Sequence, residues 1–243
     1  MKKIAVLLIV AGLTFSKSSW SQKKLTLSGF IGSGVSFFGG PGAVSKSTYY
    51  RSPVPFPNFT TDVDTMAVPY GNKPYTNFLA GINAGMKFPS KWILRFSIQY
   101  EHTGGRLDVD SITTPPVKYK TTGTYSRQYD NISFNPQIGK VLSQKKLSFI
   151  LFAGVDYTSK LAMGDECEFK DQNGQNTIIG YSGGEPEVND FRVTLGASVS
   201  YKKWGIDINY KHGLTNYNKY GTDKVFSRIF HLRLQFAFLD KSI

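Results

Sequence analysis

The residues best suited to chemistry in this chain are charged side chains that alternate with apolar ones along extended segments. Alternation places the two kinds of side chain on opposite faces of a β-strand. If eight such strands close into a narrow barrel, the charged face lies inside, where the barrel is filled by its own side chains. A narrow path for ions or protons is the alternative use of these residues. We predict an internal network of ion pairs and hydrogen bonds made by Arg95, Glu101, Asp156, Arg192, Asp207, Lys211 and Arg233.

The three histidines, His102, His212 and His231, are the residues that would serve as a catalytic base. A histidine beside a serine and a carboxylate can support lipid deacylation or acyl transfer. His102 follows Glu101, but no histidine, serine and acidic residue form a recognisable local pattern. The sequence therefore predicts no catalytic residue and no enzymatic activity.

Acidic residues concentrate between positions 158 and 190, where they offer oxygen ligands of the kind that divalent cations take. Their spacing does not match a calcium-binding loop, so we predict a solvated surface loop, no metal site and no cofactor. The single cysteine, Cys167, is predicted to be a surface thiol, and its presence alone excludes an internal disulfide. The acidic residues are Asp165, Glu166, Glu168, Asp171, Glu185, Glu187 and Asp190.

A second unusual segment, residues 39–74, is rich in proline and aromatic residues. Proline stiffens the backbone, and aromatic rings supply contact area at a low cost in side-chain entropy. Two interpretations follow: a contact surface for a protein or glycan, or a lid that folds over the mouth of the barrel. The candidate contact residues are Tyr49, Tyr50, Phe56, Phe59 and Tyr70.

Eight segments show the alternation that would position these residues. In the last of them, Phe230 and Leu232 alternate with His231 and Arg233. Such a strand turns one face to lipid and the other to a polar lumen. Pro136, in the fourth segment, predicts a bulge or a local break in the strand ladder. The predicted strands span residues 25–38, 75–88, 92–102, 125–142, 147–157, 191–201, 204–211 and 226–238.

The connections between these strands alternate in length. Short polar turns fall at residues 89–91, 143–146 and 202–203. Long segments fall at residues 39–74, 103–124, 158–190 and 215–224. Short turns at one rim and long loops at the other are typical of the periplasmic and extracellular ends of an outer-membrane barrel.

The N-terminus has the form of an export signal. Lys2 and Lys3 precede an apolar run at residues 4–15, and Ser19 and Ser21 supply small residues at a cleavage site. The run is too short to span a bilayer as a helix. We therefore predict a signal peptide at residues 1–21 and one barrel domain at residues 22–243.

The formal net charge of +12 does not indicate nucleic-acid binding, because the basic residues are scattered rather than gathered on one face. Attraction to anionic groups of envelope lipids is the expected use of this charge. A soluble barrel of the lipocalin type, or a β-sandwich, would place its charged face in water. Here the charged residues share the parity opposite to the aromatic and aliphatic ones, which favours lipid outside the barrel.

Taken together, the export signal, the eight alternating strands, the unequal connections and the aromatic-rich last strand resemble the small outer-membrane β-barrel families typified by OmpX and the membrane domain of OmpA. Within that group the chain looks most like barrels of the Bacteroidetes type, some of which, such as PorT, serve protein secretion. The resemblance implies an all-β fold: an eight-stranded antiparallel up-and-down transmembrane β-barrel with long extracellular loops and short periplasmic turns, located in the outer membrane.

The expected function is that of a non-enzymatic outer-membrane β-barrel protein acting in envelope structure or surface interaction. An accessory barrel subunit of a protein secretion or transport assembly is the alternative, and a lipid-modifying outer-membrane enzyme is third. The expected partners are outer-membrane lipid and envelope or secretion-complex proteins, with no nucleic acid.

Overall fold

The computed structural model describes residues 24–50, 65–114, 117–144, 146–170, 174–184, 189–219 and 221–242. The predicted signal peptide lies outside these ranges. Every regular element within them is a strand. The strands are β1 (Lys24–Gly39), β2 (Lys46–Tyr50), β3 (Thr65–Met66), β4 (Tyr75–Lys87), β5 (Trp92–Thr114), β6 (Val117–Gln144), β7 (Ser148–Lys170), β8 (Asn176–Gly184), β9 (Asp190–Tyr201), β10 (Trp204–Gly213) and β11 (Phe226–Ser242).

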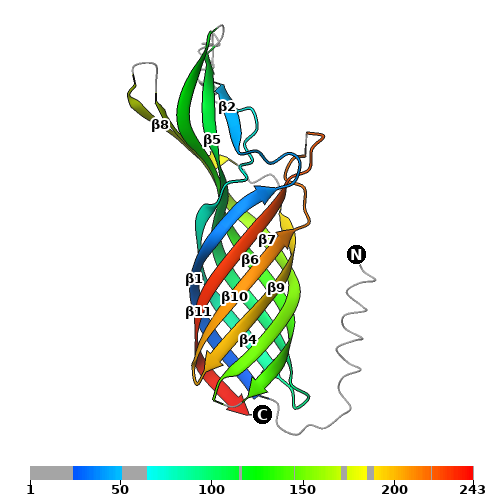
Figure 1. The fold of residues 1–243 in the computed structure, drawn as a ribbon. Coiled ribbons are helices and arrows are strands. Elements are labelled where there is room, and N and C mark those ends of the chain that lie inside the picture. The colour runs from blue at the N-terminus through cyan, green and yellow to red at the C-terminus, as the bar shows by residue number, and fades with distance from the viewer. Residues whose placement is uncertain are drawn as a thin grey trace.

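Eight of the described strands close into an antiparallel barrel, which confirms the predicted fold class (Figure 1). The order around the ring is β1, β4, β5, β6, β7, β9, β10 and β11. The ring closes because β11 pairs with β1 along its length, from Lys24 opposite Ser242 to Gly39 opposite Phe226. Closure removes the exposed strand edges that an open sheet would present.

The two faces of the barrel wall differ in polarity. Aliphatic side chains such as Ile82, Leu195 and Ile208 are exposed on the outside, whereas polar ones such as Ser97 and Asn209 are buried inside. Apolar residues outside and polar residues inside are the arrangement that a membrane-spanning barrel requires. Two sets of large aromatic residues flank the outer apolar belt: Trp92, Tyr201 and Trp204 near the short turns, and Tyr100, Tyr157 and Tyr210 toward the other end.

Short turns join β4 to β5, β6 to β7 and β9 to β10, as predicted, and lie at the end where the C-terminus is drawn (Figure 1). Lys91 and Lys202 have positive φ angles of 65° and 52°, which tight reversals at these points require. Pro136 pairs with Phe96 on β5, but the ladder from β6 to β7 is interrupted between Phe134 and Gln137 and resumes in the same register. The residue therefore causes a local break without a bulge.

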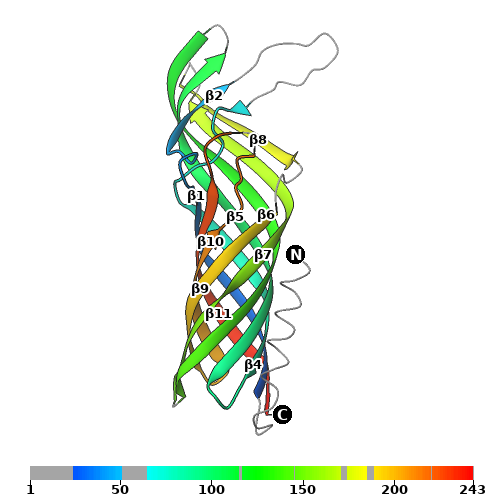
Figure 2. The ribbon, with the colours of Figure 1, turned by 90° about the vertical axis from the view of Figure 1, so that its right-hand side faces the viewer.

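The predicted loops at residues 103–124 and 158–190 are mostly strand, which corrects the sequence interpretation. β5, β6 and β7 continue far beyond the barrel, and β8 folds back onto β7 (Figures 1 and 2). β2 adds to the outer part of β5 in parallel, and β3 adds to β2. We name this extension the outer lobe; it comprises β2, β3, β8 and residues 103–114, 117–128 and 162–170.

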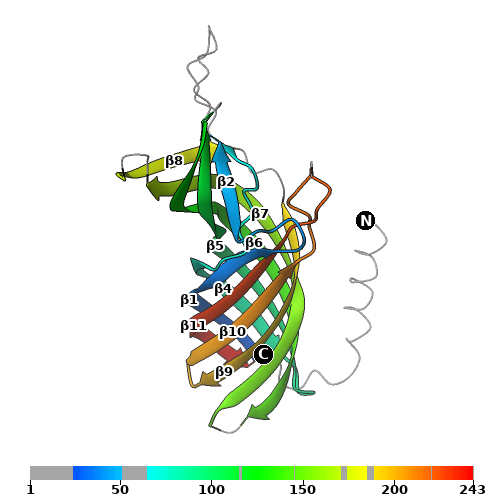
Figure 3. The same cartoon turned by 45° about the horizontal axis from the view of Figure 1, so that its top comes forward.

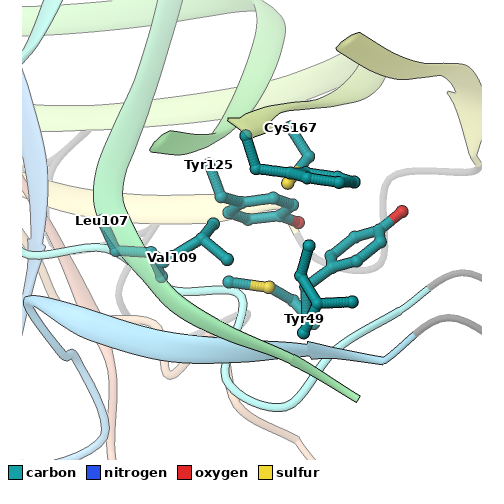
Figure 4. Close-up of a cluster of buried hydrophobic side chains, with 8 residues drawn as sticks. Tyr49, Leu107, Val109, Tyr125 and Cys167 are labelled. Atoms are coloured by element: carbon teal, nitrogen blue, oxygen red, sulfur yellow. The ribbon is translucent and has the colours of Figure 1, made fainter. Parts of the chain in front are cut away.

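The outer lobe has a hydrophobic core of its own. β2 and the outer part of β7 both belong to this lobe (Figure 3). Tyr49 of β2 packs on Phe169 of β7, with ring centroids 5.7 Å apart. Cys167 is only 2% exposed, so the prediction of a surface thiol is wrong. Figure 4 shows this core, whose buried members are Tyr49, Met66, Leu107, Val109, Ile112, Tyr125, Cys167 and Phe169.

Candidate functional site

The middle of the lumen is occupied by a cluster of four charged side chains from four strands. Arg192 Nη1 lies 2.7 Å from Glu101 Oε2 and 3.4 Å from Asp156 Oδ2. Lys211 Nζ lies 2.9 Å from Asp156 Oδ2 and also pairs with Glu101. Each cation therefore contacts both carboxylates, and all four side chains are fully buried.

A second cluster lies closer to the short turns. Asp207 Oδ2 accepts from Arg95 Nη1 at 2.8 Å and from Arg233 Nη2 at 2.7 Å. Arg95 Nε also donates to Gln137 Oε1 at 2.6 Å, and its guanidinium lies 4.0 Å from the centre of the Phe152 ring. The structure thus brings the seven predicted lumen residues together in two clusters.

Asp190 is a member of the first cluster that the sequence prediction missed. Its Oδ2 accepts from Arg192 Nε at 2.7 Å, from Tyr217 Oη at 2.9 Å and from Ser227 Oγ at 2.6 Å. From sequence, Asp190 is grouped with the acidic residues of the 158–190 loop because it follows them closely in the chain. In the structure it is the first residue of β9. With Asp190 included, these two clusters hold four cations and four carboxylates, so that each buried charge has a partner of opposite sign.

The outer mouth of the barrel is closed by a group of aromatic rings, which we name the mouth plug. Tyr70 Oη donates to the carbonyl oxygen of Tyr217 at 2.9 Å, and Tyr217 reaches down to Asp190. Lys160 Nζ lies 3.6 Å from the centre of the Tyr217 ring. The plug therefore connects the lumen clusters to the base of the outer lobe. Its buried members are Phe38, Tyr70, Tyr129, Tyr217 and Val225.

The predicted contact residues of the first long segment fall into three groups. Tyr49 is 4% exposed in the core of the outer lobe, and Tyr70 is buried in the mouth plug. Neither forms a contact surface. Tyr70 fits the lid interpretation because it helps to close the mouth of the barrel, whereas Tyr49 packs beyond the mouth, in the outer lobe. Tyr50 is 42% exposed. Phe56 and Phe59 lie outside the described residues.

The acidic residues of the β7–β8 region are largely engaged in the outer lobe. Arg127 makes two hydrogen bonds to Asp165, at 2.8 and 2.6 Å, and Glu166 accepts from Gln128 at 3.3 Å. Burial raises the pKa of nearby Tyr125 above its usual value. Asp171, Glu185 and Glu187 lie outside the described residues. Within the described ranges, no group of three His, Cys, Asp or Glu side chains is placed to hold a metal ion.

The histidines occupy three different environments. His231 is buried in the lumen, with its Nδ1 4.0 Å from Glu101 Oε1. His102 lies on the outer wall, where Nδ1 is 2.8 Å from Asp130 Oδ1 and Nε2 is 2.8 Å from Tyr75 Oη. Glu101, although adjacent in sequence, points into the lumen. His212 Nδ1 lies 3.0 Å from the Tyr210 hydroxyl.

In the part of the chain that the structure describes, no helix is long and apolar enough to cross a membrane.

Comparison with known proteins gives no family for this chain. No protein-family model matches the sequence, and no curated protein sequence matches it. Among solved structures, Ail, the attachment invasion locus protein of Yersinia pestis, is 12% identical and covers 88% of this chain and 99% of its own, with a TM-score of 0.36. Neisserial surface protein A is also 12% identical and covers 88% of this chain and 97% of its own, with a TM-score of 0.33. These scores are too low to support an inference, so the strand ladders alone define the chain as an eight-stranded transmembrane-type β-barrel with an added outer lobe.

Proposed function

We propose that this chain is a non-enzymatic outer-membrane protein that uses its barrel as an anchor and its outer lobe as a surface for interaction. The observation that carries the proposal is the continuity of β5, β6 and β7, which run from the apolar belt into a lobe with its own buried core. A lobe joined to its anchor by three paired strands holds a fixed orientation on the membrane. Strand-borne surfaces of this kind lose little conformational entropy on binding.

The interior of the barrel supports anchoring rather than solute transport. The two charge clusters and the mouth plug place paired side chains across the lumen at successive levels. An eight-stranded barrel has room for little more than its own side chains. A transported solute would have to displace several buried ion pairs at once.

The surface of the outer lobe supports interaction. Ile178 on β8 is 66% exposed and Val117 at the start of β6 is 53% exposed. Both lie beyond the aromatic residues that mark the end of the apolar belt, so lipid does not cover them. An apolar side chain that lipid does not cover offers contact area to a protein partner, and Ile178 is therefore the residue to test.

An accessory role in a secretion or transport assembly is the second candidate, favoured by the edge of β8. Among the described strands, β8 pairs with β7 alone, so its other edge offers backbone donors and acceptors to an added strand. A stable envelope partner bound at this edge would favour the accessory role over a free-standing surface protein.

The experiment compares affinity purification of the wild-type protein and an Ile178→Asp variant from mildly solubilised native membranes. Asn176→Ser, an exposed polar change on the same strand, is the matched control. We expect a partner that is retained by the wild type and the control but lost from Ile178→Asp. Equal recovery of the same partners by all three proteins would contradict a role for the outer lobe.

A further inference from the structure

We propose that a polar pocket on the outer surface of the chain, where the barrel wall meets the outer lobe, binds a glycan that carries hydroxyl and amino groups. The pocket has a volume of about 290 Å³ and lies where β4 to β7 leave the apolar belt. Its lining contains hydroxyl groups, two carboxylates and one guanidinium, with no aliphatic side chain. The lining residues are Tyr75, Thr76, Arg106, Thr124, Ser126, Glu166 and Glu168.

The strand register brings these groups onto one patch. Arg106, Ser126 and Glu166 lie opposite one another on β5, β6 and β7. Thr124 and Glu168 lie opposite one another in the next row outward. The pocket floor is therefore made by paired strands of the outer lobe, which hold the polar groups at fixed spacing.

The chemistry of the lining matches a sugar. Carboxylate oxygens of Glu166 and Glu168 accept hydrogen bonds from hydroxyl or amino groups, and Arg106 donates to ring and hydroxyl oxygens. Hydrogen bonds to charged groups are stronger than those between neutral ones. Thr124 and Ser126 both donate and accept, which suits the mixed pattern of a polyol.

The charge of the pocket disfavours an anionic ligand. Glu166 and Glu168 outnumber Arg106, the single cation in the lining. Lys73, the nearby lysine, is paired with Asp108 at 2.5 Å. A phosphate or carboxylate would meet like charge at short range. An uncharged or amino-substituted sugar would meet no such repulsion from the two carboxylates.

The inner wall of the pocket is held by a chain of hydrogen bonds from Tyr75 to His102 and Asp130. Asp130 Oδ1 accepts from Tyr100 Oη at 2.5 Å and from His102 Nδ1 at 2.8 Å. With the proton on Nδ1, His102 Nε2 accepts from the Tyr75 hydroxyl at 2.8 Å. The tautomer of His102 is assigned from this network, because the Asp130 carboxylate can only accept a hydrogen bond from Nδ1. The network fixes the position of the Tyr75 side chain, which lines the pocket.

The height of the pocket decides which glycans can reach it. It lies just beyond Tyr100 in the outer aromatic set, at the level of lipid headgroups. The sugar headgroup of a membrane glycolipid and a free oligosaccharide could both supply the ligand. This inference rests on the proposed membrane orientation but not on the partner proposed for the outer lobe.

The test uses full-length protein in phospholipid nanodiscs, with β-1,6-linked glucosamine disaccharide as the probe and glucosamine 6-phosphate as the charged comparison. Binding is measured by calorimetry. Glu168→Gln and Arg106→Gln change exposed lining residues. Asp223→Asn and Lys118→Gln, at exposed sites away from the pocket, are the matched controls.

We expect the dissociation constant of the disaccharide to rise about tenfold in each lining variant, as loss of one charge-assisted hydrogen bond predicts, and to stay unchanged in the controls. We also expect glucosamine 6-phosphate to bind more weakly than the disaccharide. No binding of the disaccharide, equal binding by all variants, or a preference for the phosphate ester would overturn the proposal. A repeat with glucosyl diacylglycerol in the nanodisc, a glycolipid with an uncharged sugar headgroup, separates the two sources: competition with the disaccharide assigns the site to a glycolipid headgroup, and unchanged binding assigns it to a free glycan.

Discussion

Glu101 and Arg192 lie 91 positions apart in the sequence, yet their side chains meet in the lumen at 2.7 Å. Glu101 also pairs with Lys211, so one carboxylate connects β5, β9 and β10 across the barrel. These contacts form without any direct strand pairing between β5 and either partner strand. The lumen clusters therefore brace opposite walls of the barrel.

The bracing predicts a large stability loss for Glu101→Gln. The change removes one negative charge and leaves Arg192 and Lys211 with a single shared carboxylate at Asp156. Breaking a buried ion pair by removing one partner costs about 3–5 kcal/mol. Urea unfolding of the protein in lipid vesicles measures the free energy of unfolding. Asp223→Asn, at an exposed loop position, is the control, and equal stability of both variants would show that the cluster does not brace the barrel.

The filled lumen also predicts the electrical behaviour of the protein. Reconstituted in a planar lipid bilayer, the wild type should give no steady single-channel current. Tyr217→Ala, which removes a central ring of the mouth plug, should stay silent too, because both charge clusters remain below it. A steady ion or proton current through the wild type would favour the alternative in which the lumen charges form a conduction path.

The core of the outer lobe predicts that the lobe can unfold while the barrel persists. Phe169→Ala removes a fully buried ring that packs on Tyr49, at a cost of about 3–5 kcal/mol. Trypsin should then cut at Lys118 or Lys120, which the wild type protects by strand pairing. The barrel fragment should keep its resistance to unfolding in detergent. Ile178→Ala, an exposed apolar change, should leave the wild-type digestion pattern intact.

The barrel could be predicted from the sequence because each of its strands keeps one parity over most of the membrane-spanning part, with register shifts near the strand ends, at Leu27/Ser28 and Val141/Ser143. On β11, residues 230, 232, 234, 236 and 238 face outward and residues 229, 231 and 233 face inward. On β5 the odd positions are polar in the lumen, at Ser97 and Gln99, but apolar in the outer lobe, at Leu107 and Val109. The same face of one strand meets a polar lumen first and a dry core later. On β5 the odd positions therefore change from polar to apolar. A pattern that changes in this way is interpreted from sequence as the end of one strand.

On β7 a β-bulge, rather than a change of environment, kept the outer part of the strand from being predicted. Ala162 pairs with Asp130 and Lys160 pairs with Asn131, so Leu161 is an extra residue that shifts the parity of everything beyond it. Cys167 and Phe169 consequently face the core of the outer lobe, although Asp156 and Thr158 face the lumen. From sequence, Asp190 is placed in the acidic loop because the start of β9 cannot be located from the alternation. In the structure Asp190 is the first residue of β9, and its side chain pairs with Arg192 in the lumen.

The proposed orientation places the outer lobe outside the cell and the short turns in the periplasm. The most direct test labels single cysteines on intact cells with a membrane-impermeant maleimide, in a Cys167→Ser background. We expect rapid labelling of Lys118→Cys, at an exposed site on the outer lobe, and no labelling of Lys203→Cys, in the turn between β9 and β10, until the cells are opened. Labelling of Lys203→Cys on intact cells, with Lys118→Cys protected, would contradict the proposed orientation.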